Sequence, residues 1–236
     1  MLTNIQIEQP EKRGYEYLNR LIYKSGEFKV FFEQIRPYED LFSQAITILE
    51  LGADQGWSSC ILKKLYPNKH ISCSDPNELI IETMKFWEEL FSVKLDNSII
   101  CKSTNIPQDN SSVDILLSYS AFHHFADFPG TLREANRVLK PGGYCLFLHE
   151  PTCRKFIHRL AYKRVNKKQP DFGEDVLIYK DILKIAKEEG FREAKIEFRP
   201  SLTNRGPLET IYYYIVGKIK VFQKTLPCTG DFILKE

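Results

Sequence analysis

The sequence predicts a doubly wound α/β protein with one mostly parallel sheet of seven strands, a closing antiparallel hairpin and a helical cap before the first strand. Three observations support this fold class. From residue 46 onward, short β-branched apolar runs recur, each continuous enough for a strand buried on both faces. Amphipathic helical segments separate the runs, as in a doubly wound sheet. The last third changes to a helix followed by strand-like runs, which would close one edge.

Composition is consistent with a single globular unit. The 236 residues are 43% hydrophobic, which is enough to bury one sizeable core. Lys and Arg number 33 and Asp and Glu 31, so the net charge of +2 gives no long-range attraction to nucleic acid or membrane. We find no secretion signal and no apolar stretch near the roughly 20 residues that cross a bilayer. We expect a cytoplasmic protein with no nucleic-acid partner and no stable membrane insertion, and the oligomeric state stays open.

The six cysteines show no Cys-x-x-Cys pair and no framework spacing. Several fall inside apolar runs, which is typical of reduced core thiols in a cytosolic protein. We therefore expect no zinc site and no other metal site.

Five runs are expected to form the parallel strands: "AITILEL" (45–51), "HISCS" (70–74), "SIICK" (98–102), "VDILLS" (113–118) and "YCLFLH" (144–149). Helices are expected between them at "WSSCILKKLY", "ELIIETMKFWEELF" and "PGTLREANRVLK", where apolar residues recur three and four positions apart. Before residue 46, "YEYLNRLIY" and "EFKVFFEQI" indicate one or two amphipathic helices that cap the domain.

Near the end of the sequence, "YKDILKIAKEEGF" predicts a helix closed by Gly190. The runs "AKIEFR" and "IYYYIV" are expected to pair as the closing hairpin, joined by the turn-rich link "PSLTNRGPLE". An insertion from Cys153 to Asp181 contains "RKFIHRLAYKRVNKK", a basic amphipathic helix over the site. A solvated lid face is its default interpretation, and an anionic acceptor, a lipid surface and RNA are alternatives.

The stretch "ITILELGADQGW" carries the first chemical signal. Its strand ends at Glu50, the chain turns at Gly52, and a helix begins near Gly56, so backbone N–H groups and a helix N-terminus face whatever lies over the strand end. Asp75 ends the second strand 23 residues after Gly52, where a carboxylate can accept hydrogen bonds from ribose hydroxyls. The competing interpretation of Asp75 is a helix N-cap, and we rank ribose binding first.

The glycines decide between two cofactors that use such a loop, NAD and S-adenosylmethionine. A dinucleotide fingerprint needs glycine at the first, third and sixth positions of the turn, which here are Gly52, Asp54 and Trp57. Trp57 cannot supply the close helix-to-strand packing of the third glycine. NAD is therefore a distant alternative.

"LELGADQGW" resembles motif I of the class I S-adenosylmethionine-dependent methyltransferases, with Glu50, Gly52 and Gly56 matching and Asp54 departing. "VDILLSYSAFHHFAD" is similar to the fourth strand and following turn of the small-molecule branch of that family. "REANRVLKPGGYCLFLHEP" is similar to its helix, turn and fifth strand. The resemblance runs from about residue 46 to 216. It implies a Rossmann-like methyltransferase fold that binds S-adenosyl-L-methionine.

The resemblance also implies a division of one methyltransferase domain, 1–236: a helical cap (1–45), a cofactor-binding half (46–151), a lid-like insertion (152–180) and a closing helix, hairpin and tail (181–236).

Carried over by position, the resemblance assigns Glu50 to the methionine ammonium, and the backbone of Gly52, Ala53 and Gly56 to the methionine moiety. Asp75 would hold the ribose and Pro76 would cover one adenine face. Lys102 stands where the family has an Asp that meets the adenine amino group, so adenine recognition is assigned to Ser103 and Thr104, with Asn105 as an alternative. Ser118 completes the predicted cofactor site.

Asp54 is expected to adopt a left-handed backbone at modest cost. Its carboxylate would attract the ammonium or repel the carboxylate of the cofactor. The competing interpretation, ranked slightly ahead, is that it points to solvent or caps the following helix.

His124 and His123 follow the fourth strand, where the resemblance places residues near the transferred methyl group. An imidazole with an ordinary pKa of about 6.5 suits deprotonation of a hydroxyl or amine acceptor. The competing interpretation is that one histidine only fixes the loop. His149 and Glu150, at the end of the fifth strand, are the next candidates.

These patterns favour methyl transfer to a small-molecule acceptor, with oxygen ahead of nitrogen or carbon. The alternative is a homologue that binds the cofactor without methylating, such as an auxiliary subunit or a cyclase, because Asp54 and Lys102 depart from the family pattern.

Overall fold

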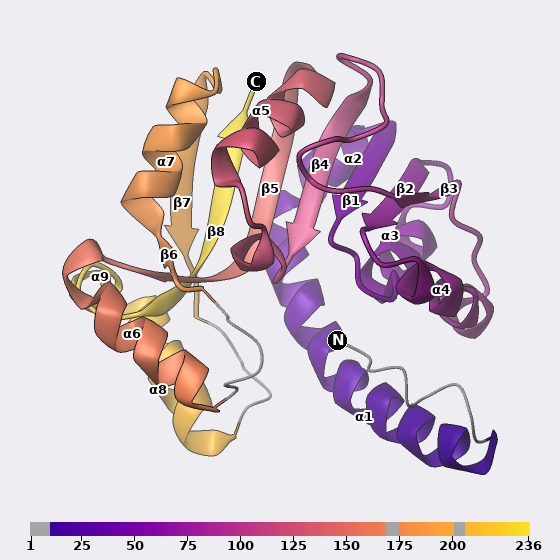
Figure 1. The fold of residues 1–236 in the computed structure, drawn as a ribbon, viewed down its shortest axis with the longest axis horizontal. Coiled ribbons are helices and arrows are strands. Elements are labelled where there is room, and N and C mark those ends of the chain that lie inside the picture. The colour runs from indigo at the N-terminus through magenta and orange to yellow at the C-terminus, as the bar shows by residue number, and fades with distance from the viewer. Residues whose placement is uncertain (1–9, 169–174, 201–205) are drawn as a thin grey trace.

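The computed structural model describes residues 10–168, 175–200 and 206–236, with the side chains of 10–21, 23, 79–83 and 168 left undescribed. Within them lies a mixed sheet whose strand order is β3-β2-β1-β4-β5-β8-β7, with β6 paired to β5 off this path (Figure 1). The strands are β1 (Thr47–Leu51), β2 (His70–Asp75), β3 (Asn97–Ile100), β4 (Val113–Tyr119), β5 (Leu139–Cys153), β6 (Leu177–Ile178), β7 (Glu193–Phe198) and β8 (Cys228–Lys235).

The first five strands run parallel, and β8 runs antiparallel to both β5 and β7. The predicted doubly wound, mostly parallel sheet is thus confirmed.

Helices cover both faces of this sheet. They are α1 (Pro10–Ile35), η2 (Arg36–Tyr38), α2 (Glu39–Gln44), α3 (Trp57–Leu65), α4 (Glu78–Phe91), η3 (Phe122–His124), α5 (Phe128–Val138), α6 (Lys155–Lys168), α7 (Tyr179–Glu188), α8 (Pro207–Lys218) and α9 (Lys220–Gln223). One core lies between the sheet and the end of α1, α2, α3 and α4, and the other lies between the sheet and α5 and α7.

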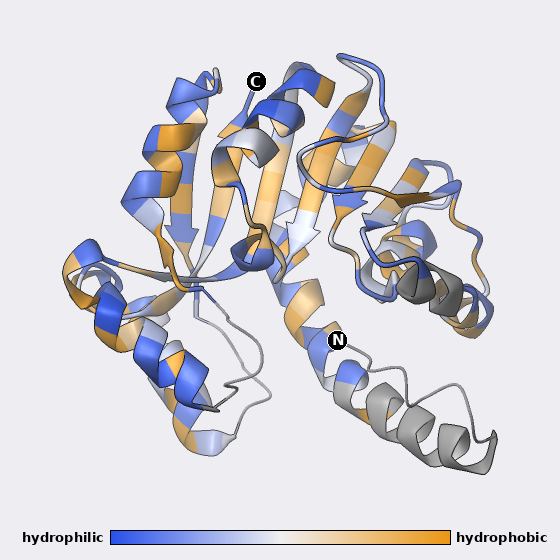
Figure 2. Ribbon diagram, in the orientation of Figure 1, coloured by the Kyte–Doolittle hydropathy of each residue, from blue (hydrophilic) through white to orange (hydrophobic). Residues whose placement is uncertain are grey.

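Alternation along the strands divides side chains between the two cores. On β4, Ile115 and Leu117 enter the first core, and Leu116 enters the second. Because both faces are buried, the central strands are apolar almost throughout, whereas the helices also carry hydrophilic residues (Figure 2). This explains why these strands could be found as continuous apolar runs.

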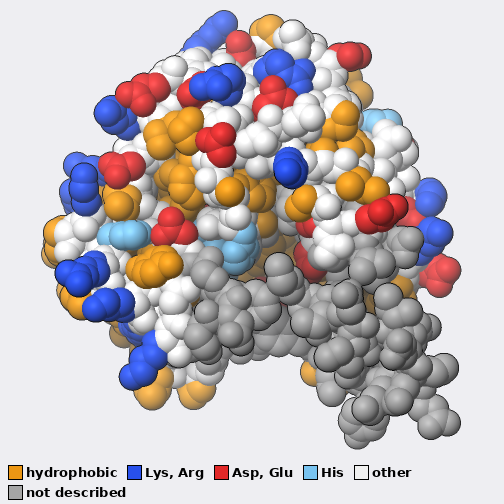
Figure 3. Space-filling model, in the orientation of Figure 1, with side chains coloured by type: hydrophobic (Ala, Val, Ile, Leu, Met, Phe, Trp, Pro, Cys, Tyr) orange, Lys and Arg blue, Asp and Glu red, His pale blue; other side chains and the backbone are white. Residues whose placement is uncertain are grey.

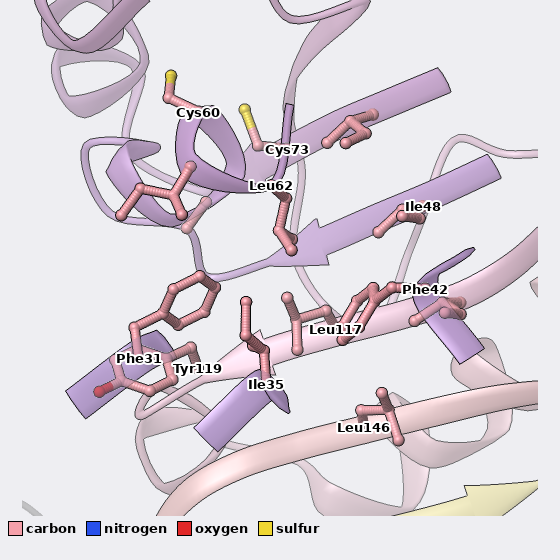
Figure 4. Packing of buried hydrophobic residues seen from close by; sticks show 14 of the residues in the cluster. Phe31, Ile35, Phe42, Ile48, Cys60, Leu62, Cys73, Leu117, Tyr119 and Leu146 are labelled. Atoms are coloured by element: carbon pink, nitrogen blue, oxygen red, sulfur yellow. The ribbon is translucent and has the colours of Figure 1, made fainter. Parts of the chain in front are cut away.

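The residues before β1 contribute directly to the first core. Phe31 and Phe42 are fully buried and Ile35 is nearly so. Figure 4 shows Phe31 and Ile35 of α1 pointing toward Tyr119 and Leu117 of β4. The Phe31 ring meets the Tyr119 ring edge-on, with centroids 4.9 Å apart. The C-terminal part of α1 is therefore fixed against the sheet.

The prediction for "IYYYIV" is wrong, because residues 211–216 lie within helix α8. The β-branched and aromatic residues favour a strand by propensity, but Pro207 occupies the first turn of a helix and Gly206 precedes it. The antiparallel closing pair exists, but its second strand is β8. Part of the predicted link, 201–205, lies outside the described residues.

The insertion after β5 forms helix α6, as predicted, and Ala161 on that helix packs against Cys153 and Val176 in a small separate cluster. All six cysteines are free thiols, and five of them are buried. None of the described helices combines the length and apolar character needed to cross a bilayer. Within the described residues, no group of His, Cys, Asp or Glu is arranged to hold a metal ion.

Candidate functional site

The carboxyl ends of β1, β2, β4 and β5 border a cavity of about 510 Å³. On the face seen in Figure 3, histidine surface lies near the centre with hydrophobic side chains around it. The cavity is lined by Lys24, Glu27, Val30, Glu50, Gly52, Ala53, Asp54, Trp57, Ser58, Asp75, Pro76, Tyr119, Ser120, Ala121, His123, His124, Phe125, His149, Pro151, Val165, Tyr213 and Thr229.

The loop after β1 is held in a tight, left-handed turn. Ala53 donates its backbone N–H to the carbonyl of Ser74 at 2.9 Å, which ties the loop to β2. Gly52 and Gly56 have φ values of 65° and 76°. A Cβ on Gly52 would lie 3.0 Å from the Cβ of Ala121, and one on Gly56 would lie 2.7 Å from the Cγ of Met84. The positive φ values and the close packing both explain why these two positions are occupied by glycine.

Glu50 is buried beneath this loop and is bound by the first turn of α3. The Ser58 hydroxyl donates to one carboxylate oxygen at 2.6 Å, and the Ser59 hydroxyl donates to the other. Burial raises the pKa of Glu50 to about 7. Glu50 lines the cavity while also anchoring α3.

Asp75, at the end of β2, lines the cavity beside Pro76. One of its oxygens accepts the Asp54 N–H at 3.2 Å, and the other accepts the Asn77 N–H at 2.9 Å. Burial raises the pKa of this carboxyl group. Asp75 therefore organises two backbone segments, and each oxygen keeps a second lone pair for a ligand hydroxyl.

Asp54 adopts the expected left-handed backbone, with φ of 49°. Its carboxylate pairs with the ammonium of Lys24 on α1, with 3.2 Å between Nζ and Oδ2. That ammonium also lies 5.5 Å from the centroid of the Trp57 ring. The capping alternative is wrong, because Gly56 is the N-cap of α3 and no side chain caps it. Asp54 joins the loop to the N-terminal helix.

Glu150 organises the turn that carries the two predicted catalytic histidines. Its fully buried carboxylate accepts the backbone N–H groups of Ala121, Phe122 and His123 at 3.0 to 3.1 Å. It also lies 2.7 Å from Nδ1 of His123. Donation from Nδ1 to Glu150 leaves Nε2 of His123 as the proton-accepting nitrogen. The ring centroids of His123 and His124 lie 4.0 Å apart.

His149 also lines the cavity, from a distorted position in β5. Its φ is 61°, and the register between β5 and β8 shifts between Phe147 and Glu150. Its backbone N–H donates to buried Asp231 at 2.9 Å, and its ring stacks on Tyr119 with centroids 5.5 Å apart. The bulge thus turns an imidazole toward the cavity.

The structure brings seven of the predicted site residues to one cavity: Glu50, Gly52, Ala53, Asp75, Pro76, His123 and His124. Four others do not line it. Gly56 shapes the loop behind it, Ser118 is fully buried in β4, and Thr104 lies on the loop after β3. On the same loop, the Ser103 hydroxyl is hydrogen-bonded to that of Thr131. The assignment of Ser103 and Thr104 to adenine stays a prediction.

Sequence reasoning did not identify Lys24, Glu27 and Val30, the three residues through which α1 lines the cavity. The only signal was the Tyr- and Phe-rich amphipathic pattern of the cap, which places a helix on the core but does not select the residues that reach the site. His149 was recognised only as a secondary candidate from its place at the strand end.

Comparison with known proteins agrees with this geometry. A family model described as a methyltransferase domain matches residues 49–147. A methyltransferase structure from Archaeoglobus fulgidus, described as S-adenosylmethionine-dependent, aligns with a TM-score of 0.63 at 17% identity, covering 94% of this chain and 100% of that one. Residues 49–147 thus resemble the methyltransferase domain, and this match together with the fold supports the predicted class I S-adenosylmethionine-dependent methyltransferase. The predicted fold and cofactor are thereby confirmed.

Curated proteins to which this chain is similar differ in acceptor atom. It is 28% identical over 102 residues to the malonyl-acyl-carrier-protein O-methyltransferase 1 of Coxiella burnetii, covering 43% of this chain and 33% of that protein. It is 25% identical over 183 residues to a thiol S-methyltransferase of Rattus norvegicus, covering 75% and 73% of the two proteins. The match thus spans about a third of the length of the first of these relatives.

Proposed function

We propose that this protein moves the methyl group of S-adenosylmethionine to a small-molecule acceptor with a protonated heteroatom, with oxygen as the first candidate atom. The observation that carries the proposal is a single cavity lined both by the loop after β1 and by His123, with the buried Glu150 carboxylate bound to that imidazole. The relatives' names, an O-methyltransferase and a thiol S-methyltransferase, support an acceptor of this kind.

The residues of the loop and of β2 suit the cofactor. When bound, S-adenosylmethionine supplies a methyl group on a positively charged sulfur, which a nucleophile displaces in line. Asp75 has lone pairs left for ribose hydroxyls, because each of its oxygens accepts one backbone N–H. Glu50 and the Gly52–Asp54 segment line the cavity where the methionine part would lie, and Pro76 lines it where the adenine would lie.

His123 is the proposed proton acceptor. With Nδ1 held by Glu150, its Nε2 can take the proton of an approaching hydroxyl or thiol. The Glu150 carboxylate then stabilises the imidazolium that forms. His124 lies against the same ring and borders the same cavity, so it is the second candidate.

The test is an incubation of the protein with S-adenosylmethionine carrying a deuterated methyl group and a panel of alcohols, phenols, carboxylic acids, thiols and amines, followed by mass spectrometry. We expect a labelled product together with S-adenosylhomocysteine. His123→Gln should lower turnover and leave S-adenosylhomocysteine affinity unchanged, whereas His158→Gln on α6, outside the cavity lining, should change neither.

Two results would contradict the proposal. Tight S-adenosylhomocysteine binding with no labelled product, from the panel or from cell extract, would favour the non-methylating alternative. If His123→Gln and His124→Gln both form labelled product at the wild-type rate, the protein transfers methyl groups but neither histidine accepts the proton.

A further inference from the structure

Helices α6, α8 and α9 form one layer beside the carboxyl edge of the sheet (Figure 1). Arg154, just before α6, donates from Nε to the carbonyl of Lys224, just after α9, at 2.9 Å. The guanidinium of Arg164 on α6 lies 5.5 Å from the centroid of the Tyr212 ring on α8. These contacts join the three helices, which we call the α6–α8–α9 layer.

The outside of this layer exposes large apolar side chains. Leu208, Ile211 and Ile215 on α8 recur three and four residues apart, so they lie on one helical face, and they are 82%, 55% and 43% exposed. On α6, Phe156 and Leu160 are one turn apart and are 72% and 68% exposed. The layer also exposes Tyr162, Tyr214, Ile219, Val221 and Phe222. Within the described residues, most of the exposed large hydrophobic side chains belong to this layer.

A patch of this kind marks an interaction surface. Scattered apolar residues are ordinary on a protein surface, but concentrated ones indicate a partner. A helix facing only water would need neither the Phe156 and Leu160 pair on α6 nor the three aliphatic residues on α8.

The same layer is basic, although the whole chain is nearly neutral. On α6, exposed Lys and Arg surround the Phe156 and Leu160 pair: Lys155, Arg159, Lys163, Arg164 and Lys167. Lys218 and Lys220 add exposed positive charge at the end of α8 and the start of α9. Glu209 is the only acidic residue in the sequences of the three helices. The surface is therefore complementary to a negatively charged one.

Aliphatic and aromatic side chains flanked by Lys and Arg match the boundary between anionic headgroups and acyl chains. There the apolar groups enter the hydrocarbon, while the long basic side chains reach the phosphates. Aliphatic residues such as Leu208 and Ile211 add nothing to binding RNA, whose bases stack on aromatic and Arg side chains. We propose that the α6–α8–α9 layer docks this protein on the surface of an anionic phospholipid membrane.

The layer also reaches the cavity, because Val165 of α6 and Tyr213 of α8 line it. Docking through this layer brings the cavity next to the lipid. In an extension that rests on the proposed function, the acceptor is a lipophilic alcohol, phenol or thiol taken from the membrane.

The test is sedimentation of the whole protein with sucrose-loaded vesicles of phosphatidylcholine alone or mixed with phosphatidylglycerol. We expect binding only to the anionic vesicles and loss of binding at high salt. Ile211→Asp with Leu208→Asp should abolish binding, whereas Leu65→Asp with Leu90→Asp, which are 44% and 46% exposed on α3 and α4, should not. Lys163→Gln should weaken binding roughly fivefold, the scale of about 1 kcal/mol per basic residue, and exposed Lys180→Gln on α7 should not.

Circular dichroism and S-adenosylhomocysteine affinity of each variant check that the fold and the cofactor site survive. Equal binding to neutral and anionic vesicles, or binding that survives the two α8 substitutions, would overturn the proposal. A dimer in sedimentation velocity that the α8 substitutions dissociate, without vesicle binding, would assign the layer to a second copy of this chain. Vesicle binding requires no turnover, so a failed methyl-transfer assay would not contradict membrane docking. Equally, a failure to bind vesicles would not contradict methyl transfer.

Discussion

At the scale of single residues, Asp54 and Lys24 show how this chain accommodates an acid where the methyltransferase motif that it resembles has a glycine. The acid keeps the left-handed turn, and its charge is paired with an ammonium from a helix 30 residues earlier. Lys24 also lines the cavity beside the loop. The pair therefore presents both charges at the end of the cavity expected to hold the amino-acid part of the cofactor, which itself carries both charges.

We predict that Lys24→Met weakens S-adenosylhomocysteine binding by about 1.5 to 3 kcal/mol, the usual scale for a hydrogen bond to a charged group. Methylthioadenosine, which lacks the amino-acid part, should bind the variant and the wild type equally well. Lys29→Met changes an exposed lysine on the same helix and should have no effect. Calorimetric titration measures all three proteins. Equal weakening for both ligands would mean that Lys24 acts only by docking α1.

Asp75→Ala should also weaken S-adenosylhomocysteine binding by about 1.5 to 3 kcal/mol, because ribose hydroxyls lose a charged acceptor. Here methylthioadenosine should lose affinity as well, since it keeps the ribose. Asp109→Ala, at an exposed position, is the control. If the same titration gives unchanged affinity while the variant unfolds more easily, Asp75 only holds the two backbone segments.

At the scale of elements, helix α1 lines the cavity, and the local sequence pattern could not predict which of its residues do so. Phe31 has no exposed surface and contacts two rings of the cavity lining edge-on: Trp57 at 5.4 Å and Tyr119 at 4.9 Å between centroids. Its neighbour Phe32 is 40% exposed. The two adjacent phenylalanines on α1 thus differ in burial, although they are the same residue type.

Phe31→Ala should lower the free energy of unfolding by about 3 to 5 kcal/mol, because it empties a packed aromatic site. Phe32→Ala should cost under about 1 kcal/mol, since its ring is already partly in water. Urea denaturation of both variants measures the difference. Similar losses for both would show that α1 is not fixed against the sheet as described.

Features set by residues close together in the sequence could be predicted, and features set by contacts between distant segments could not. The loop at Gly52 and Gly56 and the parallel strands were predictable, because turn chemistry and burial on both faces leave local patterns. The helix α8 was not, because Tyr and Ile favour strands by propensity while Pro207 and the surrounding packing decide otherwise. Strand β8 was missed because "CTGDFILKE" interrupts its apolar residues with Gly230 and Asp231. Lys24 could not be assigned, because its role depends on a contact between distant segments.

At the scale of the whole molecule, buried Asp231 joins four segments. It accepts the His149 N–H from β5 and the Tyr38 hydroxyl at 3.2 Å, and it lies 3.3 Å from Nε of Arg199, just after β7. With its amide oriented to donate, Gln34 of α1 also reaches both carboxylate oxygens. Burial raises the pKa of Asp231 from 3.8 to about 7. The folded protein thus holds a proton on Asp231 at pH values where the unfolded chain has released it.

This difference fixes the sign of the pH dependence. The contribution of Asp231 to the free energy of unfolding is fully present below pH 3.8, and it is lost as the pH rises toward about 7. Asp231→Asn should therefore reduce the fall in stability across that window, measured by urea denaturation at a series of pH values. Glu50, whose pKa is raised to about 7 in the same direction, should maintain a residual slope in the variant. A slope identical to that of the wild type would show that Asp231 is ionised throughout the window.

The position of β8 in the sheet has a consequence for synthesis. Residues 228–235 lie between β5 and β7, and among the described strands β7 pairs only with β8. While a ribosome is still adding residues before 228, the strand that will become β5 therefore presents Leu146 and Phe147 on an unpaired edge. Completion of the sheet has to wait for this late segment, so the edge of β5 stays open to pairing with other chains from the synthesis of β5 until residues 228–235 are made.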